Sequence, residues 1–481
     1  MSSSERTGSD RRTRPMLTVE HLSVAERTAR GRAARSAVPR SQQAEFAPGP
    51  DRPDPIALLE SQAESRVPDL VPIRYGRMLV SPFAFYRGAA LVMASDLAMT
   101  PVSGLRVQLC GDAHLSNFGT FGTPERRLLF DINDFDETLP GPWEWDVKRL
   151  AASLEVAARE NGFAQAEREG IVQASARSYR TAMSEFAGQT NLDVFYASLD
   201  IDQAIGEFQS TVTSKMLRRT EATVAKARTR DSMQAFNKLT HLEDGEPRIT
   251  SDPPLIVSID ELLPEDSAIQ VSEWAHQSLR AYRQTLETDR RRLLEGYRYV
   301  DLARKVVGVG SVGTRAWIAL FMGRDGVDPL FLQFKEAQPS VLEVFCGHSE
   351  YRNHAHRVVA GQRLMQAASD VFLGWMNITG LDGNKRDFYV RQLRDWKGSV
   401  EIEQMVPRGM EIYAGLCGWT LARAHARSGD RIAIAAYLGK SDNFDRAIAA
   451  FSADYADQNE RDYQALQTAV AQGRVVAEQG L

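Results

Sequence analysis

Short apolar runs bounded by turn residues indicate β-structure in two parts of this chain. The first part has runs at 105–109 and 128–130, and each is followed within a few positions by Asp, Asn or Gly. The second part has longer runs at 315–322 and 329–336, separated by a Gly-Arg-Asp-Gly turn. Because strands read as β-favouring runs with turn residues at their ends, we expect strands in both parts.

Helical periodicity is typical of much of the remaining chain. Apolar residues recur every three or four positions at 145–160, 164–186, 271–299 and 350–368. This spacing places them on one face of a helix. The pattern therefore predicts a mixed protein with long helices and two groups of strands.

Polar residues after the first two runs are the main candidates for chemistry. Residues 110–119 read Cys-Gly-Asp-Ala-His-Leu-Ser-Asn-Phe-Gly, and residues 131–137 read Asp-Ile-Asn-Asp-Phe-Asp-Glu. These segments place Asp112, Asn117 and Asp134 at the ends of neighbouring predicted strands. Kinase-type phosphotransferases use this spacing, with the first Asp orienting the attacking hydroxyl and the Asn and second Asp holding Mg²⁺.

A pair of Asx-rich hairpin turns is the alternative interpretation, because Asp, Asn and Gly favour turns. The acidic crowding at 131–137 favours chemistry, since the repulsion is costly without a bound cation. We therefore predict Asp112 as the catalytic carboxylate. The predicted metal ligands are Asn117, Asp134 and Asp136. His114 has no metal-binding companion at motif spacing, so we interpret it as a catalytic-loop residue that orients the loop.

A glycine-rich turn lies far downstream of these segments. Gly308, Gly310 and Gly313 form a Gly-x-Gly-x-x-Gly pattern. Glycines let a backbone approach phosphates closely and point N–H groups at them. The order strand, Gly-rich turn, strand, and strand carrying Lys335 is that of a kinase small lobe. An ordinary Gly-rich hairpin with a solvated lysine is the alternative.

Three further residues concern the same predicted nucleotide site. Gln392 lies in a strand-like run that leads into a connector, where a nucleotide base could meet backbone groups. Glu343 or Glu350 could pair with Lys335, and the sequence does not choose between them.

The two catalytic segments resemble the domain of unknown function 2252 family, a group of uncharacterised bacterial proteins. Further segments carry the same resemblance, at 81–88, 142–150, 361–366 and 421–426. That family is in turn similar to aminoglycoside and choline kinase-like proteins, whose loop reads His-Gly-Asp-x-His-x-x-Asn. The resemblance implies that Asp112 is the catalytic Asp, His114 the loop His and Asn117 the metal Asn. It implies Asp134 as the metal Asp, while Cys110 replaces the usual His.

The order of the parts is inverted relative to those kinases, because the catalytic loop precedes the Gly-rich turn. The resemblance therefore implies an α+β, protein-kinase-like two-lobed fold that is circularly permuted and has helical insertions. Permutation is tolerable where termini lie close together at the surface. The expected parts are a disordered basic tail at 1–55, the catalytic-loop and metal-site part at 56–190, a helical segment at 191–300, a small-lobe-like β unit at 301–400, and helices completing the large lobe at 401–481.

Composition limits the choice of function. Net charge is −5, so we expect no nucleic-acid partner, and no apolar run is long enough to span a membrane. Three cysteines suit a reducing cytoplasm. We expect an enzyme that uses ATP and Mg²⁺ to transfer phosphate to a small-molecule hydroxyl. The alternatives are AMP transfer by a kinase-like enzyme, a nucleotide-binding pseudokinase and, less favoured, a metallophosphoesterase.

Overall fold

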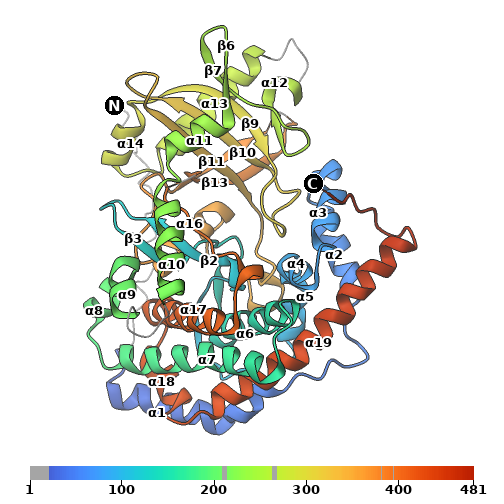
Figure 1. Ribbon diagram of the computed structural model, residues 1–481, viewed down its shortest axis with the longest axis vertical. Helices are drawn as coiled ribbons and strands as arrows, with labels where there is room; N and C mark the ends of the chain where they lie inside the picture. Colours follow the sequence, from blue (N-terminus) through green and yellow to red (C-terminus); the bar gives the residue numbers. More distant parts are fainter. Residues whose placement is uncertain (1–20, 209–213, 263–267, 381, 394, 481) are drawn as a thin grey trace, which may run out of the picture.

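The computed structural model describes residues 21–208, 214–262, 268–380, 382–393 and 395–480. Figure 1 shows an antiparallel sheet at one end of the molecule and a helical body at the other, with the small strands of the catalytic segments between them. The mixed helix and strand content expected from the sequence is confirmed.

Helices at the start of the described chain pack on the helical body. They are α1 (Val24–Ala37), the 3-10 helix η1 (Arg40–Ala44), α2 (Pro55–Ala63), α3 (Val71–Met78), α4 (Pro82–Gly88) and α5 (Ala90–Leu97). Helices α1 and η1 form within the tail that was expected to be disordered, and residues 1–20 lie outside the described residues. Ser23 and Glu26 form a capping box that starts α1. The Arg27 guanidinium then binds Asp430 (2.8 Å), which anchors the helix.

The two segments predicted to be catalytic, 110–119 and 131–137, lie within and beside two small sheets. Their strands are β1 (Arg106–Leu109), β2 (Phe118–Gly122), β3 (Leu128–Ile132), β4 (Leu139–Pro142) and β5 (Leu199–Asp200). Strand β1 pairs with β4, while β3 pairs with both β2 and β5. The strand before Asp112 therefore does not pair with the strands beside Asn117 and Asp134.

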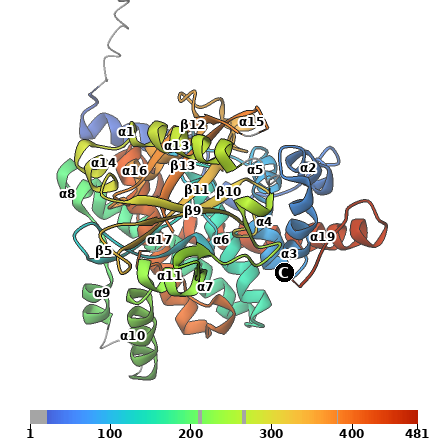
Figure 2. The ribbon, with the colours of Figure 1, turned by 90° about the horizontal axis from the view of Figure 1, so that it is seen from above.

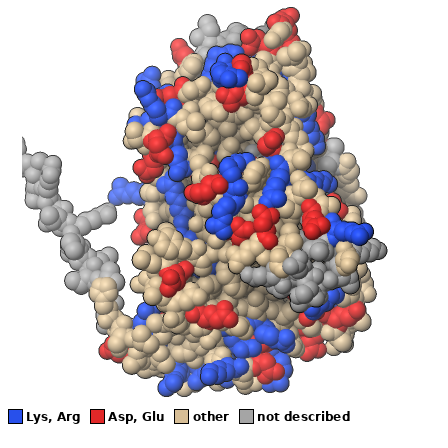
Figure 3. Space-filling view, turned by 60° about the vertical axis from the view of Figure 1, so that its left-hand side comes forward, with Lys and Arg blue, Asp and Glu red and all other residues tan. Residues whose placement is uncertain are grey.

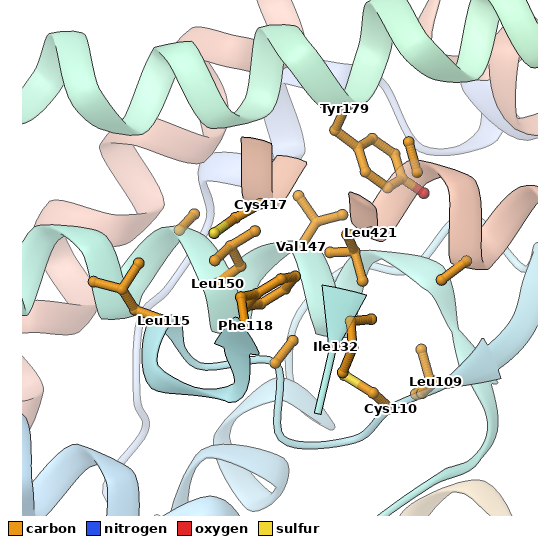
Figure 4. Close-up of a cluster of buried hydrophobic side chains, with 14 of the residues drawn as sticks. Leu109, Cys110, Leu115, Phe118, Ile132, Val147, Leu150, Tyr179, Cys417 and Leu421 are labelled. Atoms are coloured by element: carbon orange, nitrogen blue, oxygen red, sulfur yellow. The ribbon is translucent and has the colours of Figure 1, made fainter. Parts of the chain in front are cut away.

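Long helices enclose the core beneath these strands. They are α6 (Trp143–Glu160), α7 (Gln165–Ala187), α17 (Pro407–Ser428), α18 (Arg431–Leu438) and α19 (Asn443–Ala471). Figure 4 shows Leu115, Phe118 and Ile132 packed against side chains of α6 and α17, which include Leu150 and Leu421. Each such buried side chain contributes roughly 1.5–3 kcal/mol, so the apolar positions of the catalytic segments fix the polar positions between them.

The middle of the chain is less helical than expected. Helices α8 (Asn191–Tyr196), α9 (Ile201–Phe208), α10 (Ser214–Arg228) and α11 (Ser232–Leu239) lead into the hairpin β6 (Thr240–Glu243) and β7 (Glu246–Ile249). After strand β8 (Ile256–Ser258) come α12 (Ile259–Leu262), α13 (Ala268–Arg283) and α14 (Thr288–Leu294). Figure 2 shows α9 and α10 projecting from one side. The helical segment predicted at 191–300 therefore also contains short strands, because β-favouring runs interrupt the helices.

The large sheet is entirely antiparallel in the order β12-β13-β11-β10-β9-β8. Its other strands are β9 (Arg298–Lys305), β10 (Ala316–Met322), β11 (Pro329–Ala337), β12 (Gly374–Thr379) and β13 (Lys385–Gln392), with α15 (Glu343–Cys346) and α16 (His354–Met365) between β11 and β12. Side chains alternate between the two faces of each strand. Phe334 lies in the apolar cluster that α13 covers, whereas Phe331 lies in the cluster that α11 covers. Lys335 shares the face of Phe331.

The surface mixes both signs of charge. On the face shown in Figure 3, basic and acidic side chains lie interspersed. In the described part of the chain, no helix combines the length and apolar character that crossing a membrane requires.

Candidate active site

Strands β2 and β3 bring Asn117 and Asp134 to one end of a hairpin. Asn117 directly precedes β2, and Asp134 follows β3 after one residue. The N–H of Asn133 donates to the carbonyl of Asn117 (2.8 Å), which joins the two segments beyond the ladder. The side-chain nitrogen of Asn117 donates to the carbonyl of Asp112 (2.8 Å). The loop is thus tied to the hairpin, and the amide oxygen is the atom that Asn117 can offer a ligand.

Asp112 is held from behind by an arginine of α6. The Nε and Nη2 atoms of Arg149 donate to Asp112 Oδ1 at 2.9 and 2.7 Å. The second oxygen, Oδ2, lies 3.7 Å from His114 Nε2, which is beyond hydrogen-bond range. Burial lowers the pKa of His114 to about 3. His114 is therefore neutral near pH 7, and Oδ2 is the oxygen of Asp112 that has no hydrogen bond among the described residues.

Lys335 joins the large sheet to the acidic segment. Its ammonium lies 2.7 Å from Asp136 Oδ2 and 3.4 Å from Asp134 Oδ2, and its side chain is only 3% exposed. The hydroxyl of Tyr389, on the neighbouring strand β13, donates to Asp136 Oδ1 (2.6 Å). Burial opposes the charge of Lys335, but the two carboxylates outweigh burial and raise its pKa. Lys335 is therefore a buried charged group paired with the acidic segment, not a solvated surface lysine.

Basic side chains from other segments of the protein neutralise the acidic residues at 131–137. Asp131 is buried and pairs with Arg423 of α17, and Asp136 pairs with Lys335. Burial would raise the pKa of Asp134, but the charges of Lys335 and Arg391 hold it below its ordinary value. Our inference that this crowding requires a bound cation is therefore wrong, because distant basic residues neutralise the segment.

The Gly-rich turn is held in place by α3 and the residues before it. The carbonyl of Gly308 accepts from Arg77 Nη1 (2.6 Å), and that of Gly313 accepts from the N–H of Val67 (2.8 Å). Gly308 and Gly313 have φ of 67° and 91°, which other residues adopt only with strain. Ser311 donates to Asp136 Oδ2 (3.2 Å), so the turn reaches the same carboxylate as Lys335.

Comparison with known sequences places this chain in a family. A family described as "Uncharacterized protein conserved in bacteria (DUF2252)" matches residues 66–469. The chain belongs to this family. No curated protein and no solved structure matches the chain. The DUF2252 match spans every residue placed in the site above.

The segments that carry the DUF2252 resemblance supply residues that position the catalytic loop. Asp146, in the first turn of α6, accepts from the N–H groups of Cys110 (2.8 Å) and Gly111 (3.1 Å). Its Oδ2 also lies 3.2 Å from Nε2 of His425, whose Nδ1 lies 2.9 Å from the hydroxyl of Tyr179. This buried chain links the loop to α17 and α7. Cys110 contributes a backbone donor, and burial raises the pKa of its thiol.

Two sequence expectations about nucleotide contacts need correction. Neither candidate glutamate has a described contact with Lys335, and Glu343 instead lies 3.4 Å from His348. The helix between β11 and β12 presents Arg357, which donates to the carbonyl of Asp136 (2.9 Å). The N–H of Gln392 donates to Asp370, so it is not free for a base. The Gln392 residue does line a cavity of about 240 Å³.

Several residues that contact the candidate site were not predicted from the sequence. They are Arg149, Arg357, Tyr389, Arg391 and His425. Each acts through a contact distant in sequence, so no local spacing identifies it. The motif at 142–150 was the one available signal, because it contains Asp146 and Arg149.

The donor set fits Mg²⁺ bound together with phosphates. Among the described residues, no group of three or more His, Cys, Asp or Glu side chains could form a metal site. Mg²⁺, however, typically takes one or two carboxylates plus phosphates and waters. Asn117 and Asp134 supply such a set. Asp136 accepts three side-chain hydrogen bonds, from Lys335, Ser311 and Tyr389. Asp134 accepts two, from the N–H of Asp136 (3.1 Å) and from Lys335 (3.4 Å), so Asp136 is the weaker candidate ligand.

Proposed function

We propose that this protein is an ATP- and Mg²⁺-dependent phosphotransferase with a circularly permuted, kinase-like arrangement. The observation that carries the proposal is the convergence of the large sheet and the Gly-rich turn on one acidic pair. Lys335 of the sheet and Ser311 of the Gly-rich turn both contact Asp136, which lies beside Asp134. The same combination of Gly-rich turn, strand lysine and metal Asp positions ATP in protein kinases.

The strand order supports the proposal. Strands β9, β10 and β11 are neighbours, the Gly-rich turn joins the first two, and the third carries Lys335. A helix, α16, follows before the last two strands, as in a kinase small lobe. The departure is that Arg357 of α16 contacts the backbone of the acidic segment, while Lys335 pairs directly with its carboxylates.

The site residues divide the chemistry between them. Lys335 and the Gly-rich turn bind phosphates, and Asp112 accepts the proton of the acceptor hydroxyl at Oδ2 while Arg149 holds Oδ1. Asn117 and Asp134 would hold Mg²⁺, which when bound neutralises phosphate charge. His114 and Asp146 fix the loop that carries Asp112. Catalysis of this kind consists mainly of positioning and charge stabilisation.

AMP transfer is the second candidate, and one observation favours it. The N–H of Gln392 binds Asp370, and that of Leu393 binds the carbonyl of Phe331 (3.0 Å). These connector donors are therefore engaged and do not offer a base the usual backbone contacts. A nucleotide bound in the reversed orientation for AMP transfer would not need these backbone contacts to its base.

Titration calorimetry of ATP with and without Mg²⁺ tests the proposal. We expect Mg²⁺-dependent binding that Asp134→Asn weakens by about tenfold or more, the smallest effect typical of lost metal-site partners. The matched control is Asp325→Asn, because Asp325 lies in the exposed β10–β11 turn. Mass spectrometry of the products separates ADP release from AMP transfer. Absence of ATP binding under both conditions would overturn the proposal, and an unchanged Mg²⁺ dependence in Asp134→Asn would remove that residue from the site.

A further inference from the structure

Arg87, the penultimate residue of α4, lies between the catalytic loop and the Gly-rich turn. The carbonyl of the preceding residue, Tyr86, accepts from Arg149 Nη2 (2.9 Å), and Arg149 holds Asp112. On the other side, the carbonyl oxygen of Arg87 would lie 3.1 Å from a Cβ placed on Gly310. The backbone at 86–87 therefore lies between the arginine that holds Asp112 and the Gly-rich turn.

In the described part of the chain, the guanidinium of Arg87 lacks a protein partner. Its Nε is buried without a hydrogen bond, and across the described ranges the guanidinium makes no hydrogen bond or ion pair. Arg149 and Arg357, in contrast, each donate from the guanidinium to carboxylate or carbonyl oxygens. The charge of Arg87 acts on Asp112 and on His114. Because a buried polar atom without a hydrogen-bond partner is costly, the Nε of Arg87 requires an explanation, and a bound anion provides one.

We propose that Arg87 is a catalytic residue that binds the phosphoryl group during transfer. This inference rests on the proposed function. In the step, the acceptor oxygen forms a bond to the γ-phosphorus while the bond from that phosphorus to the β,γ-bridging oxygen breaks. The bonding electron pair leaves with ADP, and the hydroxyl proton moves to Asp112. Charge spreads over the equatorial oxygens in this transition state, and a planar guanidinium can donate to two of them at once.

The motif at 81–88 supports this role from the sequence side. Ser81 caps α4 by accepting from the N–H of Ala84 (3.1 Å), and Pro82 occupies the first helical position. The phenolic OH of Tyr86 donates to the carbonyl of Arg149 (2.7 Å), and the Arg149 guanidinium stacks 4.0 Å over the Tyr86 ring. The short helix is thus fixed at both ends, which holds Arg87 in a defined position.

The test is binding of Mg·ADP in the presence of aluminium fluoride, which mimics the planar phosphoryl group. Wild type should bind Mg·ADP and bind it at least about a hundredfold more tightly with aluminium fluoride, as expected for transition-state analogues. Arg87→Ala and Arg87→Lys should keep Mg·ADP affinity and lose that gain. Guanidinium ion at millimolar concentration should restore part of the gain in Arg87→Ala.

Arg304→Ala is the matched control. The Nε of Arg304 is also buried without a partner among the described residues. Arg304, however, lies opposite Trp317 in the register of β9 and β10, on the sheet face opposite Lys335. This variant should keep the full gain, and loss of the gain here would make the effect structural and overturn the inference. If Arg87→Lys retains the full gain, the inference also fails while the proposed function stands. If wild type binds no Mg·ADP, the proposed function itself fails and takes the inference with it.

Discussion

The ion pair between Lys335 and Asp136 offers a direct measure of the site's assembly. We consider the variants Lys335→Met and Asp136→Asn and their combination. Removing one partner of a buried pair typically costs about 3–5 kcal/mol. Asp136→Asn should cost less, about 2–3 kcal/mol, because Asp134 remains 3.4 Å from the ammonium.

Lys335→Met leaves two neighbouring carboxylates without their shared cation. Their side chains are 28% and 29% exposed, so water screens part of the repulsion, and we expect a cost of about 1–2 kcal/mol. Each single variant loses the attraction between Lys335 and Asp136, and the double variant loses this same attraction only once. The coupling free energy should therefore be about 2 kcal/mol, within the range that contacting residues show.

Urea unfolding followed by tryptophan fluorescence is the assay, since Trp317 and Trp375 lie in the same sheet as Lys335. The control cycle uses the exposed pair Arg324 and Asp325, for which we expect at most about 0.5 kcal/mol of coupling. The m-value must stay constant for the free energies to be comparable. A coupling at Lys335 and Asp136 no larger than in the control cycle would refute the assignment of this pair as the link between sheet and acidic segment.

Three further variants concern the loop that carries Asp112 and Asn117 and a buried lysine of α6. Asp112→Asn should bind Mg·ATP nearly as wild type does but lose turnover by roughly a hundredfold or more, because a general base acts in the transition state. Asn117→Ala should lose Mg²⁺ affinity and rate together, and equal behaviour of the two variants in calorimetry and turnover assays would contradict these roles. Burial lowers the pKa of Lys148 to about 8, which is below its value in the unfolded chain. The charged lysine therefore opposes folding at low pH, and this penalty disappears as the pH rises to the unfolded pKa. Lys148→Met should therefore raise the free energy of unfolding by about 1–3 kcal/mol at pH 7.5 and by little near pH 10.5, and a destabilised variant in urea titrations at pH 7.5 would disprove the argument.

Residues with local signals could be predicted from the sequence. Asn117 and Asp134 follow or precede short apolar runs, and the structure places both at strand ends in one hairpin. The strands expected at 315–322 and 329–336 are confirmed as β10 and β11, so Lys335 lies on the expected strand. In these cases turn chemistry and strand alternation act over a few residues, and the sequence carries them directly.

Partners that come from distant segments could not be predicted. The acidic segment was expected to need a cation because Asp131 finds Arg423 only through the packing of α17. Helix α1 was missed because its apolar face is weak and its stability comes from contacts with α18. The capping box at Ser23 was the local signal that could have identified it. The bond from the Gln392 N–H to Asp370 was missed for the same reason, since Asp370 lies in another loop.

The long sequence separation between the loop and α17 has a consequence for synthesis on the ribosome. Asp131 and Arg423 are 292 positions apart, and Asp146 and His425 are 279 apart. A nascent chain thus exposes the carboxylates long before their partners emerge, since translation proceeds at about 5–20 residues per second. The catalytic loop cannot take its final form during most of elongation. Truncated products that end before α17 should therefore lack an organised site even when their earlier helices have formed.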